Sequence, residues 1–299
     1  MPATGETYAL LAAFAYGLAG VSIVKGKATA QGDNGVFLAV VTTACLSAAL
    51  WLIWGRLSLT DLMSKASLVA VVSFAAAGLF STVLGRITMY RATEQIGAVT
   101  AGFLRRLTPV FALPLAFVVV GQMPHSMELL GGLIVLLGVT LYLRAPNWRP
   151  SLSLSAGLVL GIASAFFYAL SYALRSWALE RLPDPALGAL IGALVGCLWF
   201  PLVAAIHPTK PRGPHTLLID RGPWHWITAL ALSFGQLLQF LALQSTSVLA
   251  VSVIGSLDIL FSAALIVVLR SGEPIAVRRL MVAALLAIMG ITMMLTVPA

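Results

Sequence analysis

The sequence predicts an all-α polytopic membrane protein with ten transmembrane helices, arranged as two inverted five-helix repeats. The first observation behind this prediction is composition: of 299 residues, 60% are hydrophobic and only 9% are charged, whereas soluble domains have about 25% charged residues. The second is a set of matches between the two halves of the chain at one constant spacing. The composition alone excludes a soluble globular protein.

Ten apolar stretches are long enough to cross a hydrocarbon core of about 30 Å as helices. They cover residues 7–24, 36–54, 68–90, 96–120, 127–143, 152–177, 185–206, 224–243, 248–269 and 275–297. The segments between them are too short to form a separate soluble domain. Any function therefore has to be performed in or beside the membrane.

The two halves of the chain match at a constant offset of 150 residues. A single match of this kind is expected by chance in an apolar sequence, but five matches without a gap indicate a duplication. They are Gly85 with Gly235, Tyr90 with Phe240, Ala92 with Ala242, Phe111 with Phe261 and Pro124 with Pro274. We predict a first repeat over residues 1–147 and a second over residues 148–299.

Five spans per repeat force the second copy to enter the membrane from the opposite side. Inverted repeats of this kind are characteristic of carriers that work by alternating access, with the substrate site near mid-membrane where the halves meet. A transporter is therefore the function class that the duplication favours over a channel or a structural scaffold.

Basic residues are concentrated in the loops on one side of the predicted bundle, and such loops favour the cytoplasm. The crowded side has Lys25, Lys27, Arg91, Arg144, Arg149, Lys210, Arg212, Arg221, Arg270, Arg278 and Arg279; the other has Arg56, Lys65, Arg181 and in one assignment Arg175. This predicts a bacterial inner-membrane protein with both termini in the periplasm; the alternative is that both termini are in the cytoplasm. The net charge of +8 is scattered rather than gathered into a stripe, so no nucleic-acid partner is expected.

Ionisable residues at membrane depth are functional candidates, because an unpaired charge there costs several kcal/mol. The predicted spans contain few of them: Arg86, Arg105, Arg106 and Asp258, together with the amides Gln236 and Gln239. Alternatively, the fourth span begins later and both of its arginines reach the interface. Asp258 could equally be held in an internal ion pair with one of the arginines.

Helical spacing places polar and aromatic side chains together on two faces. Thr82, Arg86 and Tyr90 share one face of the third span, and Gln236, Gln239 and Phe240 share one face of the eighth; Tyr168 and Tyr172 of the sixth are further candidates. We expect the third, fourth, eighth and ninth spans to bound one cavity. Such a lining suits a ligand with a zwitterionic head and an apolar or aromatic body.

Proline and glycine residues predict local features of two spans. Pro109 and Pro114 should bend the fourth span, either as a gating kink or as a fixed bend. Gly188, Gly192 and Gly196 allow close helix packing in the seventh span, which we expect within one chain rather than between two. The protein is expected to be a monomer in the bilayer.

Short motifs near the end of each half resemble the EamA domain, the five-helix repeat of the drug/metabolite transporter superfamily. In the first half they are residues 107–111, Gly121-Gln122, residues 131–134 and Gly138-Val139; in the second they are residues 257–261, Gly272-Glu273 and Gly290-Ile291. Ile259 replaces the usual Pro, and Gln122 replaces the Glu that usually follows the turn Gly. Within the family the chain looks most like bacterial aromatic amino-acid exporters.

The resemblance implies export of small metabolites, most of all aromatic and other neutral amino acids, with facilitated diffusion as the expected mechanism. A proton-coupled exporter of drugs or other metabolites is the alternative. Small relatives of that kind use a Glu in their first helix, and the first predicted span has none. An intramembrane enzyme is a remote alternative, since the spans contain no nucleophile–base pair or metal-ligand cluster, and no cofactor or metal is expected.

Overall fold

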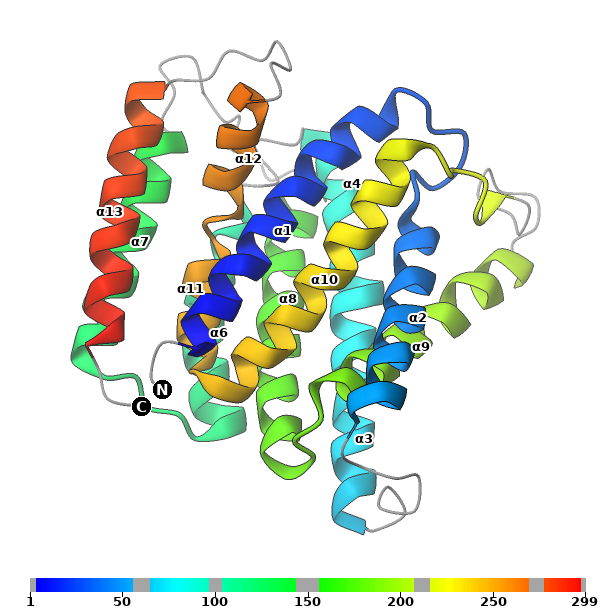
Figure 1. The fold of residues 1–299 in the computed structure, drawn as a ribbon, viewed down its shortest axis with the longest axis horizontal. Helices are drawn as coiled ribbons and strands as arrows, with labels where there is room; N and C mark the ends of the chain where they lie inside the picture. Colours follow the sequence, from blue (N-terminus) through cyan, green and yellow to red (C-terminus); the bar gives the residue numbers. More distant parts are fainter. Residues whose placement is uncertain are drawn as a thin grey trace.

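The computed structural model describes residues 4–55, 65–96, 104–143, 156–206, 216–268 and 277–296. All regular secondary structure in these ranges is helical, which confirms the predicted fold class (Figure 1). Eight helical segments have the length and hydropathy of a membrane span, and two shorter apolar helices, Thr108–Val120 and Ser126–Leu141, bring the number in the described chain to ten.

The first repeat contributes five spans, two of which include a π-helical segment. They are α1 (Thr4–Lys27); α2 (Val36–Trp54); α3 (Lys65–Gly78) continued by the π segment η2 (Leu79–Gly85) and α4 (Arg86–Ile96); α6 (Thr108–Leu115) continued by the π segment η3 (Ala116–Val120); and α7 (Ser126–Leu143). π-Helical turns inside α-helices often mark functional sites.

The second repeat contributes the other five spans. They are α8 (Ala156–Arg181), α9 (Pro185–Ile206), α10 (Pro223–Ser245), the pair α11 (Val248–Gly255) and α12 (Asp258–Val268), and α13 (Val277–Leu295). The two ends of the described chain lie on the same face of the bundle (Figure 1).

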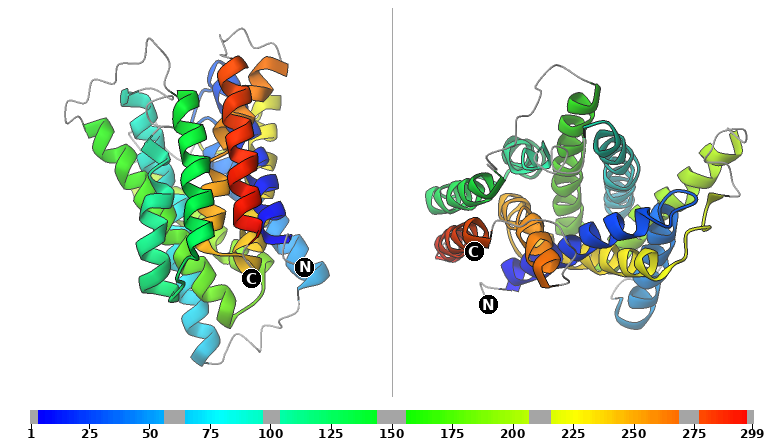
Figure 2. Two further views of the ribbon diagram at one scale, coloured as in Figure 1. Left: turned by 90° about the vertical axis from the view of Figure 1, so that its left-hand side faces the viewer. Right: turned by 90° about the horizontal axis from the view of Figure 1, so that it is seen from above.

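The helices pack as two interlocked halves rather than as two separate bundles (Figures 1 and 2). The first span of each repeat lies along the third span of the other, so α1 packs on α10, and α8 packs on α3, η2 and α4. The second spans, α2 and α9, pack on each other, and so do the fifth spans, α7 and α13. This reciprocal pattern is what a two-fold relation between inverted repeats requires.

Small residues let these helices approach closely. The three glycines of α9 face neighbours inside the chain, as predicted: Gly188 faces Phe74, Gly192 faces Gly78, and Gly196 faces Thr82 and Val40. A Cβ atom added to Gly78 would lie 2.5 Å from the Gly192 Cα atom. The backbones of α3 and α9 therefore touch, and no larger residue fits at this crossing.

The fourth span of each repeat differs from the prediction. The first was expected over residues 96–120 but its helix begins at Thr108, after a turn at Arg106 and Leu107. The second was expected to be continuous over residues 248–269 but is broken by a turn at Ser256 and Leu257. The two turns occupy equivalent positions at the 150-residue offset, so the duplication includes the break.

Proline chemistry explains the first break. Pro109 has no N–H to donate to the Arg105 carbonyl, and the Thr108 hydroxyl donates to that oxygen instead, at 2.7 Å. Pro109 therefore lies in the first turn of α6 and does not kink a continuing helix, which corrects that part of the prediction. Pro114 does lie inside α6, shortly before η3.

We predict that Gly78→Ala lowers the stability of the protein by about 1–3 kcal/mol, because the new methyl group overlaps the backbone of α9. Thermal unfolding of the purified protein in detergent would measure the loss. Gly255→Ala is the matched control, since a Cβ atom at Gly255 has nothing within 4 Å. Equal unfolding temperatures for the two variants would contradict the close contact.

Candidate functional site

A cavity of about 130 Å³ lies between the two repeats. Its walls are the first and third spans of both: α1 and η2–α4 from the first repeat, α8 and α10 from the second. Tyr16 and Gln236 lie close to the midpoints of α1 and α10, which places the cavity near mid-depth. An engineered apolar cavity of roughly 150 Å³ accommodates benzene. The size therefore suits a small metabolite.

The set of spans that bounds this cavity differs from the predicted set. The third and eighth spans line it as expected, but the first and sixth spans complete the wall in place of the ninth. The fourth span contributes Arg105 from the turn region before α6. The reason is the reciprocal packing, which brings first spans, rather than fourth spans, against third spans.

Arg175 of α8 is the most deeply buried cation of the cavity, with 2% of its surface exposed. Its Nη1 donates to Gln239 Oε1 at 2.8 Å, its Nη2 donates to Ser81 Oγ at 2.6 Å, and its guanidinium carbon lies 4.6 Å from the centre of the Phe240 ring. Phe240 is 1% exposed and packs beneath Arg175 rather than lining the cavity. Neither Arg175 nor Ser81 was a candidate from the sequence.

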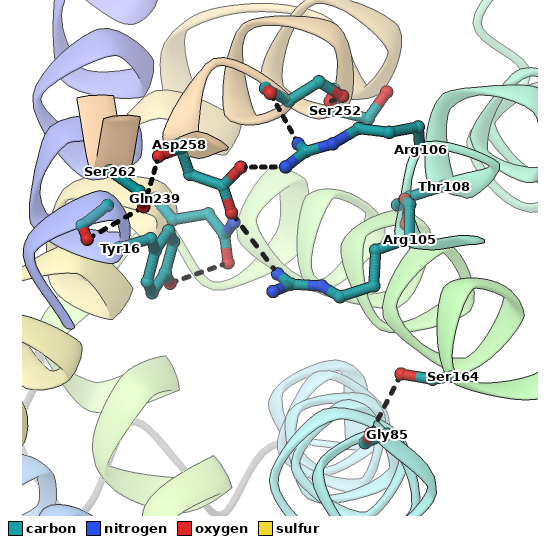
Figure 3. A network of polar contacts seen from close by, with 12 residues as sticks. Tyr16, Gly85, Arg105, Arg106, Thr108, Ser164, Gln239, Ser252, Asp258 and Ser262 are labelled. Atoms are coloured by element: carbon teal, nitrogen blue, oxygen red, sulfur yellow. Dashed lines mark hydrogen bonds and ion pairs between the residues drawn. The ribbon is translucent and has the colours of Figure 1, made fainter. Parts of the chain in front are cut away.

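Three tyrosines give the cavity an aromatic wall. Tyr168 and Tyr172 line it from α8, and Tyr16 lines it from α1. The Tyr16 hydroxyl donates to Gln239 Oε1 at 3.4 Å, so this amide oxygen accepts from two elements (Figure 3). The Arg105 guanidinium carbon lies 5.5 Å from the centre of the Tyr168 ring.

Several polar atoms of the lining have no hydrogen-bond partner among the described residues. Three of them belong to residues that were candidates from the sequence, Thr82 Oγ1, Arg86 Nη1 and Gln236 Nε2, and a fourth is Arg175 Nε; all are buried. Thr82 is 3% exposed and Gln236 is 7% exposed. Buried donors without partners are rare in proteins, so these atoms are candidates to bind a ligand or water. These three residues, together with Gln239 and Tyr168, were candidates from the sequence. Their role in substrate binding stays a prediction.

The two helix breaks meet at the edge of this site (Figure 3). Arg106 Nη2 lies 2.5 Å from Asp258 Oδ1, and Arg106 Nη1 donates to the Ser256 carbonyl oxygen at 2.5 Å. Arg105 Nη2 lies 3.7 Å from Asp258 Oδ2. Asp258 is in the first turn of α12, where a helix favours negative charge, and Ser256 follows the end of α11, where it favours positive charge. Arg106 therefore joins both repeats.

These contacts decide two alternatives left open by the sequence. Arg105 and Arg106 lie at a turn between helices and face Asp258, so neither reaches the membrane surface as an interfacial side chain. Asp258 is in the internal ion pair that was its alternative assignment. The side chain of Tyr90 lies outside the described residues. Among the described residues, no group of three or more His, Cys, Asp or Glu could hold a metal ion.

Hydrogen bonds between the repeats close the face on which the chain ends lie (Figure 1). Gln122 is central to them: its Oε1 accepts from the Val248 N–H at 3.1 Å and its Nε2 donates to Ser176 Oγ at 3.4 Å. Nearby, the Thr246 hydroxyl donates to Glu6 at 2.6 Å, and the Ser247 hydroxyl donates to Glu128. We call these four bonds the closing layer.

Comparison with known proteins agrees with this architecture. Residues 3–144 and 155–296 each match the EamA-like transporter family. A solved structure, described only as a crystal structure of a protein, is similar over 98% of this chain and 96% of its own, with a TM-score of 0.72 and 16% identity. At that identity the likeness shows the fold alone. A search of curated proteins found no match. The chain belongs to the EamA-like transporter family and is a two-repeat membrane transporter of the drug/metabolite type.

Proposed function

We propose that this protein exports small metabolites by alternating access through the central cavity, as a facilitated carrier without obligatory ion coupling. Aromatic and other neutral amino acids are the substrates that the resemblance implies. The observation that supports this most directly is the cavity itself, which lies near mid-depth between inverted repeats, beside two broken helices. This is the usual position of the substrate site in carriers with inverted repeats.

The lining supports recognition of a carboxylate joined to an apolar or aromatic body. Guanidinium groups bind carboxylates through paired, charge-assisted hydrogen bonds, and Arg86, Arg105 and Arg175 all line the cavity. Tyrosine rings on α1 and α8 offer flat apolar surface with hydroxyl groups. A substrate with one carboxylate and one ring would use both kinds of group.

The closing layer supports alternating access. Two of its bonds join the connection between α10 and α11 to Glu6 of α1 and to Glu128 of α7. The other two join Gln122, in the turn after η3, to α8 and to α11. All four are side-chain hydrogen bonds beside a buried apolar cluster that includes Val248 and Leu249. In our proposal, rocking of the repeats breaks them and opens the cavity to the face on which the chain ends lie.

The geometry gives little support to the alternative, a proton-coupled exporter of cations. Cations would meet three lining arginines. The helix α1 begins earlier than predicted and so includes Glu6, but this carboxylate accepts a hydrogen bond from Thr246 and does not line the cavity. Asp258 is engaged by two arginines. Titration of these groups is not needed for a carrier that runs down the substrate gradient.

For orientation, we predict that the cavity lies in an inner membrane with both chain ends in the periplasm. A C-terminal alkaline phosphatase fusion after Ala299 should be active, and a fluorescent protein that folds only in the cytoplasm should be dark at the same position. The opposite pattern would reverse the assignment and with it the direction in which the closing layer opens.

We predict that single cysteines at Thr82 and Gln239 react with a membrane-impermeant thiol reagent, because both residues line the cavity. The background should lack Cys45 and Cys197. Ser233→Cys is the control, since this buried residue bonds to Thr43 and does not line the cavity. Substrate should protect the two cavity positions. Labelling at Ser233 equal to that at Thr82 would show general unfolding, and inert cavity positions would contradict an aqueous site.

We predict that Asp258→Asn destabilises the protein by about 3–5 kcal/mol, because it leaves the largely buried Arg106 and the partly buried Arg105 without their carboxylate. Glu180→Gln is the matched control: its carboxylate is half exposed beside Arg181, and such pairs contribute about 0–1 kcal/mol. Thermal unfolding of the two variants gives the comparison.

We also predict that wild-type flux in liposomes persists without a pH gradient. If wild-type flux requires the gradient, and the Asp258→Asn variant transports without it, Asp258 is a coupling site and the uncoupled mechanism is wrong.

A further inference from the structure

The charges around the cavity do not balance. Arg86, Arg105 and Arg175 line it, and no acidic side chain is among its lining residues in the described part of the chain. Arg106 and Asp258, at its edge, form the close ion pair and cancel each other. The Asp258 carboxylate is therefore paired mainly with Arg106, and the distance from its Oδ2 to Arg105 Nη2 is longer, 3.7 Å. The lining keeps an excess of positive charge.

An ammonium group would find few acceptors in this lining. The Gln239 side-chain oxygen already accepts from Arg175 and from Tyr16. The Ser81 hydroxyl donates to the Ala77 carbonyl and accepts from Arg175. A buried cation needs a paired anion or several acceptors to offset its loss of hydration. Three arginines would in addition repel it.

An anionic group, in contrast, finds donors that have no other partner. Arg86 Nη1, Gln236 Nε2 and the Thr82 hydroxyl are buried, unpartnered within the described chain, and belong to residues that line this cavity. Arg86 and Gln236 are equivalent residues at the 150-residue offset, so they reach the site from opposite walls, η2–α4 and α10. Each of these groups is a hydrogen-bond donor from which a carboxylate oxygen can accept.

We infer that the substrate is an organic anion, a carboxylate with an apolar or aromatic body and no ammonium group, rather than a zwitterionic amino acid. This inference rests on the proposed function, a carrier with its substrate site in this cavity, and it replaces the amino acids that the resemblance implies with another class of substrate. The carboxylate binds Arg86, Gln236 and Thr82, the ring lies against the tyrosine wall, and Arg175 remains bound to Ser81 and Gln239 beneath it.

Three probes that share one aromatic body and differ only in charge test this inference. They are 3-phenylpropionate, phenylalanine and phenethylamine, which near neutral pH are an anion, a zwitterion and a cation. Binding to the purified wild-type protein is measured by calorimetry at constant ionic strength. We expect 3-phenylpropionate to bind at least about tenfold more tightly than phenylalanine, because three lining arginines repel the ammonium group and no described lining residue offers it a carboxylate, and phenethylamine not to bind.

Each other outcome has a distinct meaning. If phenylalanine binds as tightly as 3-phenylpropionate or more tightly, the inference is wrong and the proposed amino-acid carrier stands. If phenethylamine binds best, both the inference and the proposed substrate class are wrong, and the cation exporter is favoured. If none of the three binds or crosses liposomes faster than it crosses protein-free liposomes, the proposed function fails together with the inference.

Two variants locate the anion. Arg86→Gln should weaken 3-phenylpropionate binding about tenfold or more, the usual loss for a hydrogen bond to a charged group. Arg91→Gln is the matched control, an exposed arginine on the same helix that does not line the cavity. Gln236→Glu should move the preference from 3-phenylpropionate towards phenylalanine, since it adds a carboxylate for the ammonium group. An unchanged preference in this variant, when it is folded, would contradict the site.

Flux gives an independent readout that structural damage would not imitate. Uniport of an anion moves net charge, so a potential of about 60 mV, positive on the receiving side, should raise 3-phenylpropionate accumulation about tenfold at equilibrium. Phenylalanine accumulation should not respond. Accumulation of 3-phenylpropionate that ignores the potential, after subtraction of the protein-free control, would contradict transport of the anion.

Discussion

The contact between Arg106 and the second helix break holds the centre of this protein together. A broken helix inside a membrane leaves backbone groups that water cannot reach, and these must be satisfied by protein or line a cavity. Arg106 donates to the Ser256 carbonyl at the end of α11 and pairs with Asp258 at the start of α12, so one side chain compensates both new helix ends. Because Arg106 itself lies at the equivalent break of the first repeat, the contact also fixes the two repeats to each other.

Reciprocal packing then places the cavity. With the fourth spans joined at their breaks, the first span of each repeat lies along the third span of the other, and these four helices enclose a space between them. The duplication supplies a symmetric frame, but the lining has diverged: Arg86 in η2–α4 corresponds to Gln236 in α10, and Thr82 corresponds to Leu232. The frame is shared by both halves, whereas the chemistry of the cavity is asymmetric and is specific to this chain.

Much of this frame follows from the sequence, because span length and hydropathy reflect the bilayer, and the repeat offset reveals the duplication. The sequence also allowed us to predict that Thr82, Arg86, Gln236 and Gln239 line the cavity. Helical spacing places them on two faces, and a polar side chain is costly to bury in a membrane unless it faces a partner or a cavity. Arg175 was missed because it was weighed as a loop charge, although the predicted sixth span, residues 152–177, already contained it; α8 buries it. The π segment η2 and the break at Ser256 carry no local Pro signal, and tertiary contacts decide them.

Helical spacing also predicted that Phe240 lines the cavity. It packs beneath Arg175 instead, and this contact explains how a positive charge is accommodated at the cavity. Phe240 packs on Phe74 with ring centres 6.0 Å apart and presents its face to the Arg175 guanidinium. A buried guanidinium over an aromatic face, with two hydrogen bonds to neutral side chains, keeps its charge without a carboxylate. The cavity can therefore hold a positive charge at its base without an acidic partner, and this leaves the unpartnered donors of Arg86 and Gln236 to respond to whatever enters.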